Sequence, residues 1–223
     1  LGANTSVSLS AAWADLSVSH FKGFASLLPY PADAENMIWA YDDFTGLQGT
    51  PVATEIYHSI RSMQAAARSV ALDPNNDYGV ALYAAANLRR ENRAETAGVM
   101  DPVYGDQDRS PQFYATVFGT GIGQQVLALG LGDNDTALVR DALAALAITT
   151  GDMGLFSGEE FGGPLRQALR YPDRRVQIEA AIIVAEAQPR ASFGDEPLVM
   201  AELSNAIRGY GQPSAVVVAA TEE

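Results

Sequence analysis

Four arginines gather around a Tyr-Pro-Asp corner and are the residues best spaced to bind a charged ligand: Arg166, Arg170, Arg174 and Arg175. Arg166 and Arg170 lie one helical turn apart, so a helix here presents both on one face. Guanidinium groups bind carboxylates and phosphates, and this arginine patch could receive an acidic segment of a partner or a phosphate. Pairing with Glu179 and other nearby acids is the simpler interpretation, and the sequence leaves both open.

The other side chains capable of chemistry do not form a site. His20 and His58 are the two histidines, and they lie in separate segments without the paired spacing of a zinc site. Glu159 and Glu160 could do acid–base work, but nothing in the sequence places an opposing group. The sequence therefore predicts no catalytic residue, no metal site and no cofactor.

Two stretches, one rich in glycine and one rich in acidic residues, partly match the sequence patterns of ligand-binding loops. GTGIG (119–123) lacks the preceding strand and the third spaced glycine of a dinucleotide loop, so close helix packing explains it better. DPNNDYG (73–79) offers oxygen ligands at alternate positions, but Tyr78 and Ala84 stand where an EF-hand loop needs glycine and glutamate. We interpret it as a capped turn, and the acidic stretch 101–108 as a solvated loop.

The arginine patch lies on a predicted helix pair. Pro172 ends the first helix because proline has no N–H and restricts the preceding residue, and Asp173 is placed to cap the second helix. One apolar stripe at helical spacing comprises Val176, Ala180, Ile183, Val184 and Ala187, and a second line comprises Ile178, Ile182 and Ala185. Two apolar faces predict burial between layers of stacked repeats. Arg175 and Glu179 are spaced for a weak i,i+4 pair.

A similar unit lies upstream, from Leu127 to Ala147. A shift of 38 positions superimposes Asp135 on Asp173, and it aligns apolar residues such as Leu138 with Val176 in the same register. A period near 40 residues with two helices per unit is typical of HEAT repeats.

The segments LGDNDTALVRDALAAL and LRYPDRRVQIEAAIIVAEA resemble the HEAT-repeat pattern of a leucine, an aspartate-containing turn, and Val-Arg followed by small residues. The resemblance covers about residues 112–208. Tyr171 replaces the usual turn aspartate of the second unit, and Gln177 stands where the arginine kept as Arg140 in the first unit would be, so the side-chain ladder between repeats is incomplete. The chain also resembles the repeat region of large, mostly planctomycete, bacterial proteins of unassigned role, in which a receiver-like α/β domain follows the helices.

The remaining segments complete a division of the chain into four parts. Residues 1–53 are irregular, with short helices predicted over Ala11–Leu28 and Ala34–Phe44 and a strand or linker at NTSVSLS (4–10). Residues 54–110 form a helical hairpin and a polar loop, with a domain seam at 91–111. Residues 111–208 form the HEAT-like repeats, and residues 209–223 form a tail.

Two helices of this division have predicted core faces. Helix Thr54–Leu72 is predicted to have a core stripe of Ile56, Ile60, Met63, Ala67 and Val70. Helix Glu196–Arg208 is predicted to turn Met200, Leu203 and Ile207 inward. In the tail, Ser214–Glu223 is a β-branched run. The resemblance implies that it is the first strand of a following receiver-like domain, and a disordered or loosely docked tail is the alternative.

Composition limits the classes of function. The 223 residues carry a net charge of −13, which argues against binding to nucleic acid and to anionic membrane surfaces. No apolar run approaches the roughly 18 residues of a membrane span, and the absence of cysteine excludes disulfides and thiolate metal sites. Because the chain begins with Leu1 and not methionine, we expect a processed or partial chain.

These observations predict an all-α fold, an α-α superhelix of HEAT-like helical hairpins with a short terminal strand as an option. The predicted function is a non-catalytic protein-interaction or scaffold module that binds another protein or its own downstream domain. A regulatory input segment for a following receiver-like signalling domain is one alternative, and an enzyme with an all-helical cleft is the second.

Overall fold

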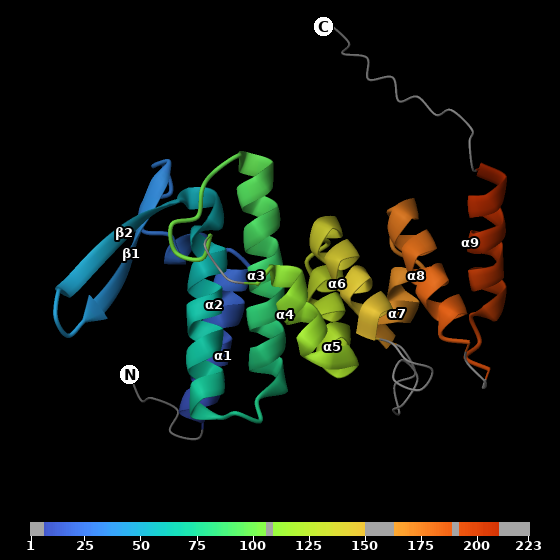
Figure 1. The fold of residues 1–223 in the computed structure, drawn as a ribbon, viewed down its shortest axis with the longest axis horizontal. Helices are drawn as coiled ribbons and strands as arrows, with labels where there is room; N and C mark the ends of the chain where they lie inside the picture. The colour runs from blue at the N-terminus through green and yellow to red at the C-terminus, as the bar shows by residue number, and fades with distance from the viewer. Residues whose placement is uncertain (1–6, 106–108, 150–162, 189–191, 210–223) are drawn as a thin grey trace, which may run out of the picture.

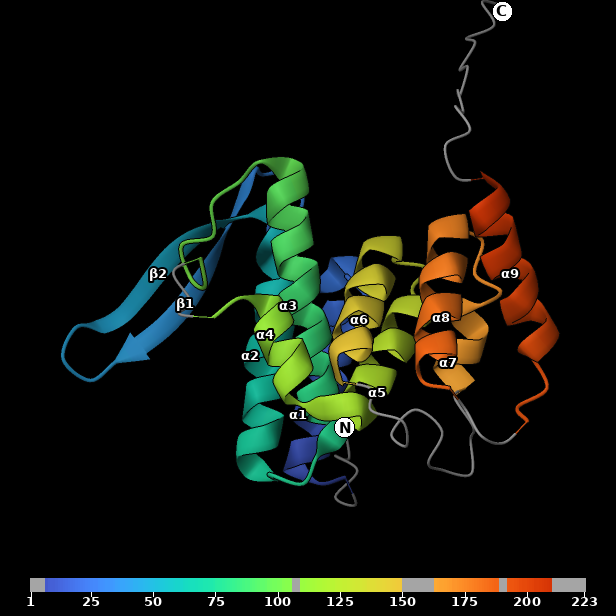
Figure 2. The same cartoon turned by 45° about the vertical axis from the view of Figure 1, so that its right-hand side comes forward.

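Helices make up most of the computed structural model, which describes residues 7–105, 109–149, 163–188 and 192–209 (Figure 1). The elements are α1 (Leu9–Phe21), a short 3-10 helix (Ala25–Leu27), β1 (Glu35–Asp42), β2 (Gly46–Ala53), α2 (Thr54–Leu72), α3 (Asp77–Ala97), α4 (Pro111–Val117), α5 (Gly119–Gly132), α6 (Thr136–Thr149), α7 (Gly163–Ala168), α8 (Arg174–Glu186) and α9 (Glu196–Gly209). Neighbouring helices pack side by side in a row from α1–α3 to α9, and the strands project from the opposite end to α9 (Figures 1 and 2). The prediction of a mostly helical fold is confirmed, whereas the proposed terminal strand at 214–223 lies outside the described residues.

Pairs of serines join α1 to α2. The Ser17 hydroxyl donates to the Ser62 carbonyl at 2.9 Å, and the Ser62 hydroxyl donates back to the Ser17 carbonyl at 3.0 Å. Ser10 and Ser69 repeat this exchange two helical turns away, at 2.9 and 2.7 Å. Advancing seven residues along α1 therefore means going back seven along α2, which makes the two helices antiparallel. Each buried hydroxyl is satisfied across the interface, so small polar side chains let the backbones approach without leaving an unpaired group.

The predicted helix pair around Pro172 is confirmed at the local level. Asp173 is the N-cap of α8, and its carboxylate accepts bonds from the backbone N–H groups of Arg175 and Val176 at 2.8 and 3.2 Å. The first predicted stripe, from Val176 to Ala187, is buried throughout. The second line is not: Ile182 is 41% exposed and Ala185 is also exposed. The prediction that this second line is buried was therefore wrong, because α6 and α9 pack against other sides of α8 and leave Ile182 at an open edge.

The upstream unit places its aspartate in the same way. The Asp135 carboxylate accepts a bond from the Leu138 backbone N–H at 3.1 Å, in front of α6. Leu138 and Ala142 are buried, as their alignment with Val176 and Ala180 predicts. Most of the core is one continuous cluster that runs from Phe21 through α3, α5, α6 and α8 to Val199.

Residues 34–44 correct a sequence prediction. The expected helix Ala34–Phe44 is instead strand β1, which pairs antiparallel with β2 in the register Trp39↔Gly49. The connection is a tight loop in which Asp42 accepts bonds from the Phe44 and Thr45 N–H groups and Gly46 has φ +75°. A left-handed glycine after a short loop is a hairpin feature, and the β-branched and aromatic residues of β1 favour a strand.

Smaller boundary differences have local causes. α1 ends at Phe21 because Gly23 is in the left-handed region (φ +67°), so the predicted helix to Leu28 is interrupted. The described part of NTSVSLS caps and begins this helix through Ser8. The sequence pattern predicts a helix over Tyr78–Arg90, and α3 extends beyond it to Ala97 and stops at Gly98 (φ +65°). In α2, the predicted core residue Ala67 is exposed, and Ser62, Ala66 and Ser69 are buried in its place. In α9, the predicted inward residues Met200 and Ile207 are exposed, because the face that packs on the core carries Val199.

The loop after α3 is anchored to that helix. The side chains of Arg90 and Asp101 are both buried and form an ion pair, and the second Asp101 oxygen accepts bonds from the Val103 and Tyr104 N–H groups at 2.8 and 3.1 Å. The division of the chain into separate domains near this loop stays a prediction.

Candidate functional site

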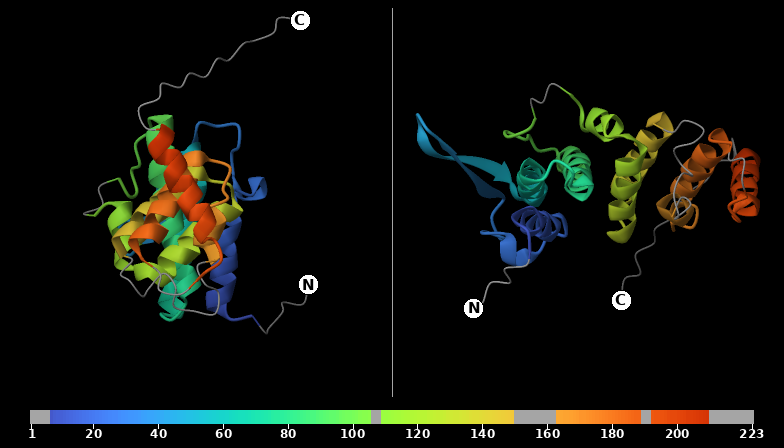
Figure 3. Two further views of the ribbon diagram at one scale, coloured as in Figure 1. Left: turned by 90° about the vertical axis from the view of Figure 1, so that its right-hand side faces the viewer. Right: turned by 90° about the horizontal axis from the view of Figure 1, so that it is seen from below.

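Two adjoining cavities form a groove across α3, α6 and α8, which we call the helical groove. One cavity, of about 440 Å³, lies between α6 and α8 and reaches Asn92 of α3. The other, of about 550 Å³, lies between α2, α3 and the start of α6 and is lined in part by His58 and Arg93. Asn92 and Ala137 line both cavities, so the groove is continuous from α2 to α8. The right-hand view of Figure 3 shows the row of helices that the groove crosses.

The floor of the helical groove is apolar and built from small residues. Ala137, Ala144 and Ala147 face it from α6 and are exposed, and Ile182 faces it from α8. Alanines leave open space next to α8 that a leucine or isoleucine at the same positions would fill. Such a surface fits a side chain supplied by another molecule.

The edge of the groove is polar, and side-chain contacts between helices hold it. Arg140 binds Glu179 from α6 to α8 through Nε at 3.0 Å and Nη2 at 2.7 Å. Asn92 Nδ2 donates to Asp141 Oδ2 at 2.6 Å, which joins α3 to α6. Burial raises the pKa of the Asp141 carboxyl against the opposing effect of the Asn92 bond. The Glu179 partner is therefore Arg140 of the preceding unit, and the i,i+4 pair with Arg175 that the sequence suggested is not the contact that forms.

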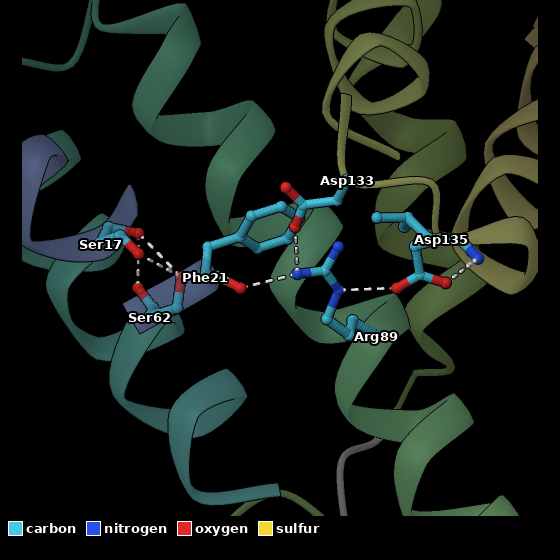
Figure 4. Close-up of polar contacts among 7 residues, drawn as sticks. Ser17, Phe21, Ser62, Arg89, Asp133 and Asp135 are labelled. Atoms are coloured by element: carbon cyan, nitrogen blue, oxygen red, sulfur yellow. Dashed lines mark hydrogen bonds and ion pairs between the residues drawn. The ribbon is translucent and has the colours of Figure 1, made fainter. Parts of the chain in front are cut away.

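The junction between α1–α3 and the α5–α6 pair is centred on Arg89 (Figure 4). Its Nη1 donates to the Phe21 carbonyl at 2.7 Å and lies 2.9 Å from Asp133 Oδ2, and its Nε donates to Asp135 Oδ2 at 2.8 Å. The guanidinium carbon lies 3.6 Å from the centre of the Phe21 ring. One buried arginine thus binds the end of α1 and the α5–α6 turn at once, and it fixes α3 against α6 where the groove runs.

The two histidines, separate in the sequence, meet in the structure. His20 Nδ1 and His58 Nδ1 are 3.2 Å apart, so one ring donates an N–H to the other. The two rings therefore cannot both carry a proton on Nδ1. Burial, together with His58 and Arg61, lowers the pKa of His20 to about 4. Burial and Arg93 lower the pKa of His58. The pair is therefore neutral at pH 7.

The arginine patch is divided between internal and exposed roles. Arg166 and Arg170 of the α7 region both bind the buried Asp195 carboxylate, which precedes α9. Arg174 donates to the Asn205 carbonyl of α9 at 3.3 Å, and Arg175 is exposed. Three of the four predicted site residues therefore contact α9 or the residue before it, and Arg175 is exposed without such a contact.

The loop motifs of the sequence have structural roles in helix packing and helix capping. GTGIG forms the start of α5, where a Cβ at Gly123 would lie 2.9 Å from Leu146 Cδ2, so glycine permits the close approach of α6. In DPNNDYG, the Asn76 side chain caps α3 and also donates to Ser69 Oγ at 2.9 Å. Glu159 and Glu160 lie outside the described residues. Across the described ranges, no group of three or more His, Asp or Glu side chains is arranged to hold a metal ion.

Sequence reasoning missed the residues that build the groove and the junction. The sequence pattern placed Ile182 on a buried face. It gave no reason to single out Asn92, Asp141 or Arg89, because the residues that they contact lie 46 to 49 positions away. The available indication was the charged run RRENR (89–93) in the middle of an apolar helix pattern, because buried charges require partners.

Comparison with known proteins gives no relative: no protein-family model, no curated protein and no solved structure matches the chain. The likeness to HEAT repeats therefore rests on the residues quoted above. Within the described residues, no helix has both the length and the apolar character needed to cross a bilayer.

Proposed function

We propose that this chain is a non-catalytic protein-interaction module of the α-solenoid type. Its working surface is the helical groove, and its ligand is a segment of another protein or of a domain that follows it. The observation that carries the proposal is the continuous groove across α3, α6 and α8, with exposed alanines and Ile182 on its floor and the Asn92–Asp141 and Arg140–Glu179 contacts at its edge. Such a combination of apolar floor and polar edge is typical of sites that bind peptides and proteins.

Contacts between side chains hold the groove in shape without a ligand, which suits it to binding. Arg89 fixes α3 to the α5–α6 turn, Asn92 fixes α3 to α6, and Arg140 fixes α6 to α8. A surface that such contacts already hold in place loses little conformational entropy on binding. The shape of the floor and the exposed side chains beside it then determine which segment binds.

Panning a random peptide display library on the protein tests the proposal. Peptides selected on the wild-type chain are expected to lose binding to Ala144→Arg and Ile182→Arg, because both substitutions fill the groove from positions that are exposed. Ile207→Arg is the matched control, since Ile207 is exposed on α9 and does not line the groove. Selected peptides that bind both groove variants as well as wild type, or the absence of any selected peptide, would overturn the assignment.

A further inference from the structure

A second groove, distinct from the helical groove, lies between strand β1 and the α1–α2 pair, and we call it the strand groove. It encloses about 700 Å³ and is lined by Trp13 of α1, by Trp39 and Tyr41 of β1, and by Arg61, Gln64 and Arg68 of α2. Figures 1 and 2 show the hairpin projecting away from the helices beside α2. The proposed function does not use this surface.

The strand groove is bounded by the free edge of β1. Three consecutive residues of β1, 39 to 41, line it, and no residue of β2 does. Successive side chains of a strand point to opposite faces, so only an edge presents consecutive residues to one space. In a two-stranded sheet this edge carries backbone N–H and C=O groups that β2 does not bind, and such edges accept an added strand.

The two faces of the hairpin differ, and this difference orients an added strand. Ile38 and Val52 on one face are buried against Ile56 and Ile60 of α2. Trp39 and Tyr41 on the other face are exposed. A strand added beside β1 would therefore turn one set of alternate side chains toward α2 and the other set along the aromatic face.

The α2 side of the strand groove is basic. Arg61 and Arg68 are seven residues apart, which places them on one helix face about 10 Å apart along the axis. Neither forms an ion pair with any residue that the structure describes. Arg61 Nη1 donates to Gln64 at 2.8 Å, while its Nε is buried without a hydrogen-bond partner.

This local charge is unusual for the molecule. The chain has 27 acidic and 14 basic residues, yet no acidic residue lines the strand groove. Two arginines free of protein carboxylates in such a chain are complementary to carboxylates of a ligand. The outer part of the hairpin bears Asp42 and Asp43, so a second copy of the same hairpin would bring like charges together.

We propose that the strand groove binds an extended, acidic segment of a partner protein that adds a third strand to the free edge of β1. Carboxylates on alternate positions of the segment bind Arg61 and Arg68, and apolar side chains on the intervening positions continue the surface of Trp39 and Tyr41. Backbone bonds to β1 supply affinity, and the arginines select the charge of the segment.

The chain carries its own reporter of binding, because its two tryptophans, Trp13 and Trp39, both line the strand groove. An alternating glutamate–valine peptide is expected to change the tryptophan emission and to bind less tightly as salt increases. An alternating lysine–valine peptide of the same length is expected not to bind. Arg61→Gln and Arg68→Gln are each expected to weaken binding about tenfold, the size of a lost charge-assisted hydrogen bond. Arg175→Gln, which removes an exposed arginine elsewhere, is the control and should bind like wild type.

Backbone pairing is tested in the peptide, so folding of the protein is not in question. N-methylation of all glutamates blocks one set of alternate N–H groups, and N-methylation of all valines blocks the other. Only one of these peptides should lose binding, because only one set faces β1. Equal loss with both, no loss with either, tighter binding of the lysine peptide, or emission changes caused by phosphatidylcholine vesicles and not by peptide would overturn the proposal. Ile182→Arg leaves the strand groove intact, so failure here is distinct from failure of the helical groove.

Discussion

At the junction of α3 with the α5–α6 turn, one buried arginine is held by two partly exposed carboxylates, whereas before α9 one buried carboxylate is held by two exposed arginines. Arg89 is 3% exposed, and its partners Asp133 and Asp135 are 25% and 24% exposed. Asp195 is 6% exposed, and its partners Arg166 and Arg170 are 41% and 55% exposed. The two junctions use the same pair of groups with the buried charge reversed.

The difference decides what each junction can tolerate. Arg89 is buried and carries only hydrogen-bond donors, so its guanidinium needs its acceptors permanently. Asp195 can be protonated, and its two arginine partners are already partly exposed, so they stay hydrated when the ion pairs break. We therefore expect the Arg89 junction to contribute more to stability and the Asp195 junction to release α9 under acid conditions.

Removing Arg89 should have the largest effect. Arg89→Ala leaves the Phe21 carbonyl without its donor, separates Asp133 from its cation and removes the contact with the Phe21 ring. Breaking a buried ion pair typically costs 3–5 kcal/mol, so we expect the free energy of unfolding to fall by about 4 kcal/mol. Urea denaturation followed by circular dichroism measures it. A loss below about 1 kcal/mol, the level of an exposed pair, would mean that the junction is not structural.

Acid should weaken the first three helices through the histidine pair. The pKa of His20 is lowered to about 4 in the folded protein by burial, His58 and Arg61, so the unfolded chain binds more protons below pH 6.5. Stability is then full above pH 6.5 and falls as pH drops toward 4, by about 3 kcal/mol in total. His20→Gln should remove most of this slope in urea titrations between pH 7 and pH 4. An unchanged slope would show that other groups control the acid response.

The Asp195 junction should open at lower pH and at smaller cost. Arg170 and Arg166 lower the pKa of Asp195 to about 2, so its contribution is present above pH 4 and is lost as pH falls through about 2. Asp195→Asn should destabilise the chain by about 1 kcal/mol, because the arginines return to water.

Mobility of α9 measures this directly. The chain has no cysteine, so Ile207→Cys, an exposed position on α9, accepts a single fluorescent label. Label anisotropy should fall between pH 4 and pH 2 in the wild-type background and be low already at pH 7 with Asp195→Asn. Equal anisotropy in the two backgrounds at pH 7 would contradict the assigned role of Asp195.

The smallest effect is expected at the pair between α6 and α8. Arg140 and Glu179 are 43% and 32% exposed, so Arg140→Ala should change the free energy of unfolding by less than about 1 kcal/mol. The same urea titration that measures Arg89→Ala provides the comparison. Similar losses for the two arginines would show that burial is not what separates strong from weak junctions.

Local features of the fold could be predicted from sequence. Pro172 and Asp173 set the start of α8, and the stripe from Val176 to Ala187 is buried, because caps and helical periodicity depend on neighbouring residues. The hairpin was mistaken for a helix, since residues 34–44 do not alternate strictly and the indication of a turn lay beyond them, at Gly46.

The candidate sites could be predicted only in part. Arg166 and Arg170 were recognised as a pair, but their partner Asp195 lies across a loop and gives no periodic pattern. The helical groove depends on which face of α8 is left uncovered by α6, and the strand groove depends on where the hairpin projects. Both are consequences of tertiary packing that spacing along the chain does not encode.

Hydrogen exchange of the protein with and without a library-selected peptide tests the central claim most directly. If a partner segment lies along the helical groove, amides of α3, α6 and α8 should exchange more slowly together in the complex, while those of α9 should be unchanged. Slower exchange confined to other elements, or no change in these three helices at saturating peptide, would contradict the account.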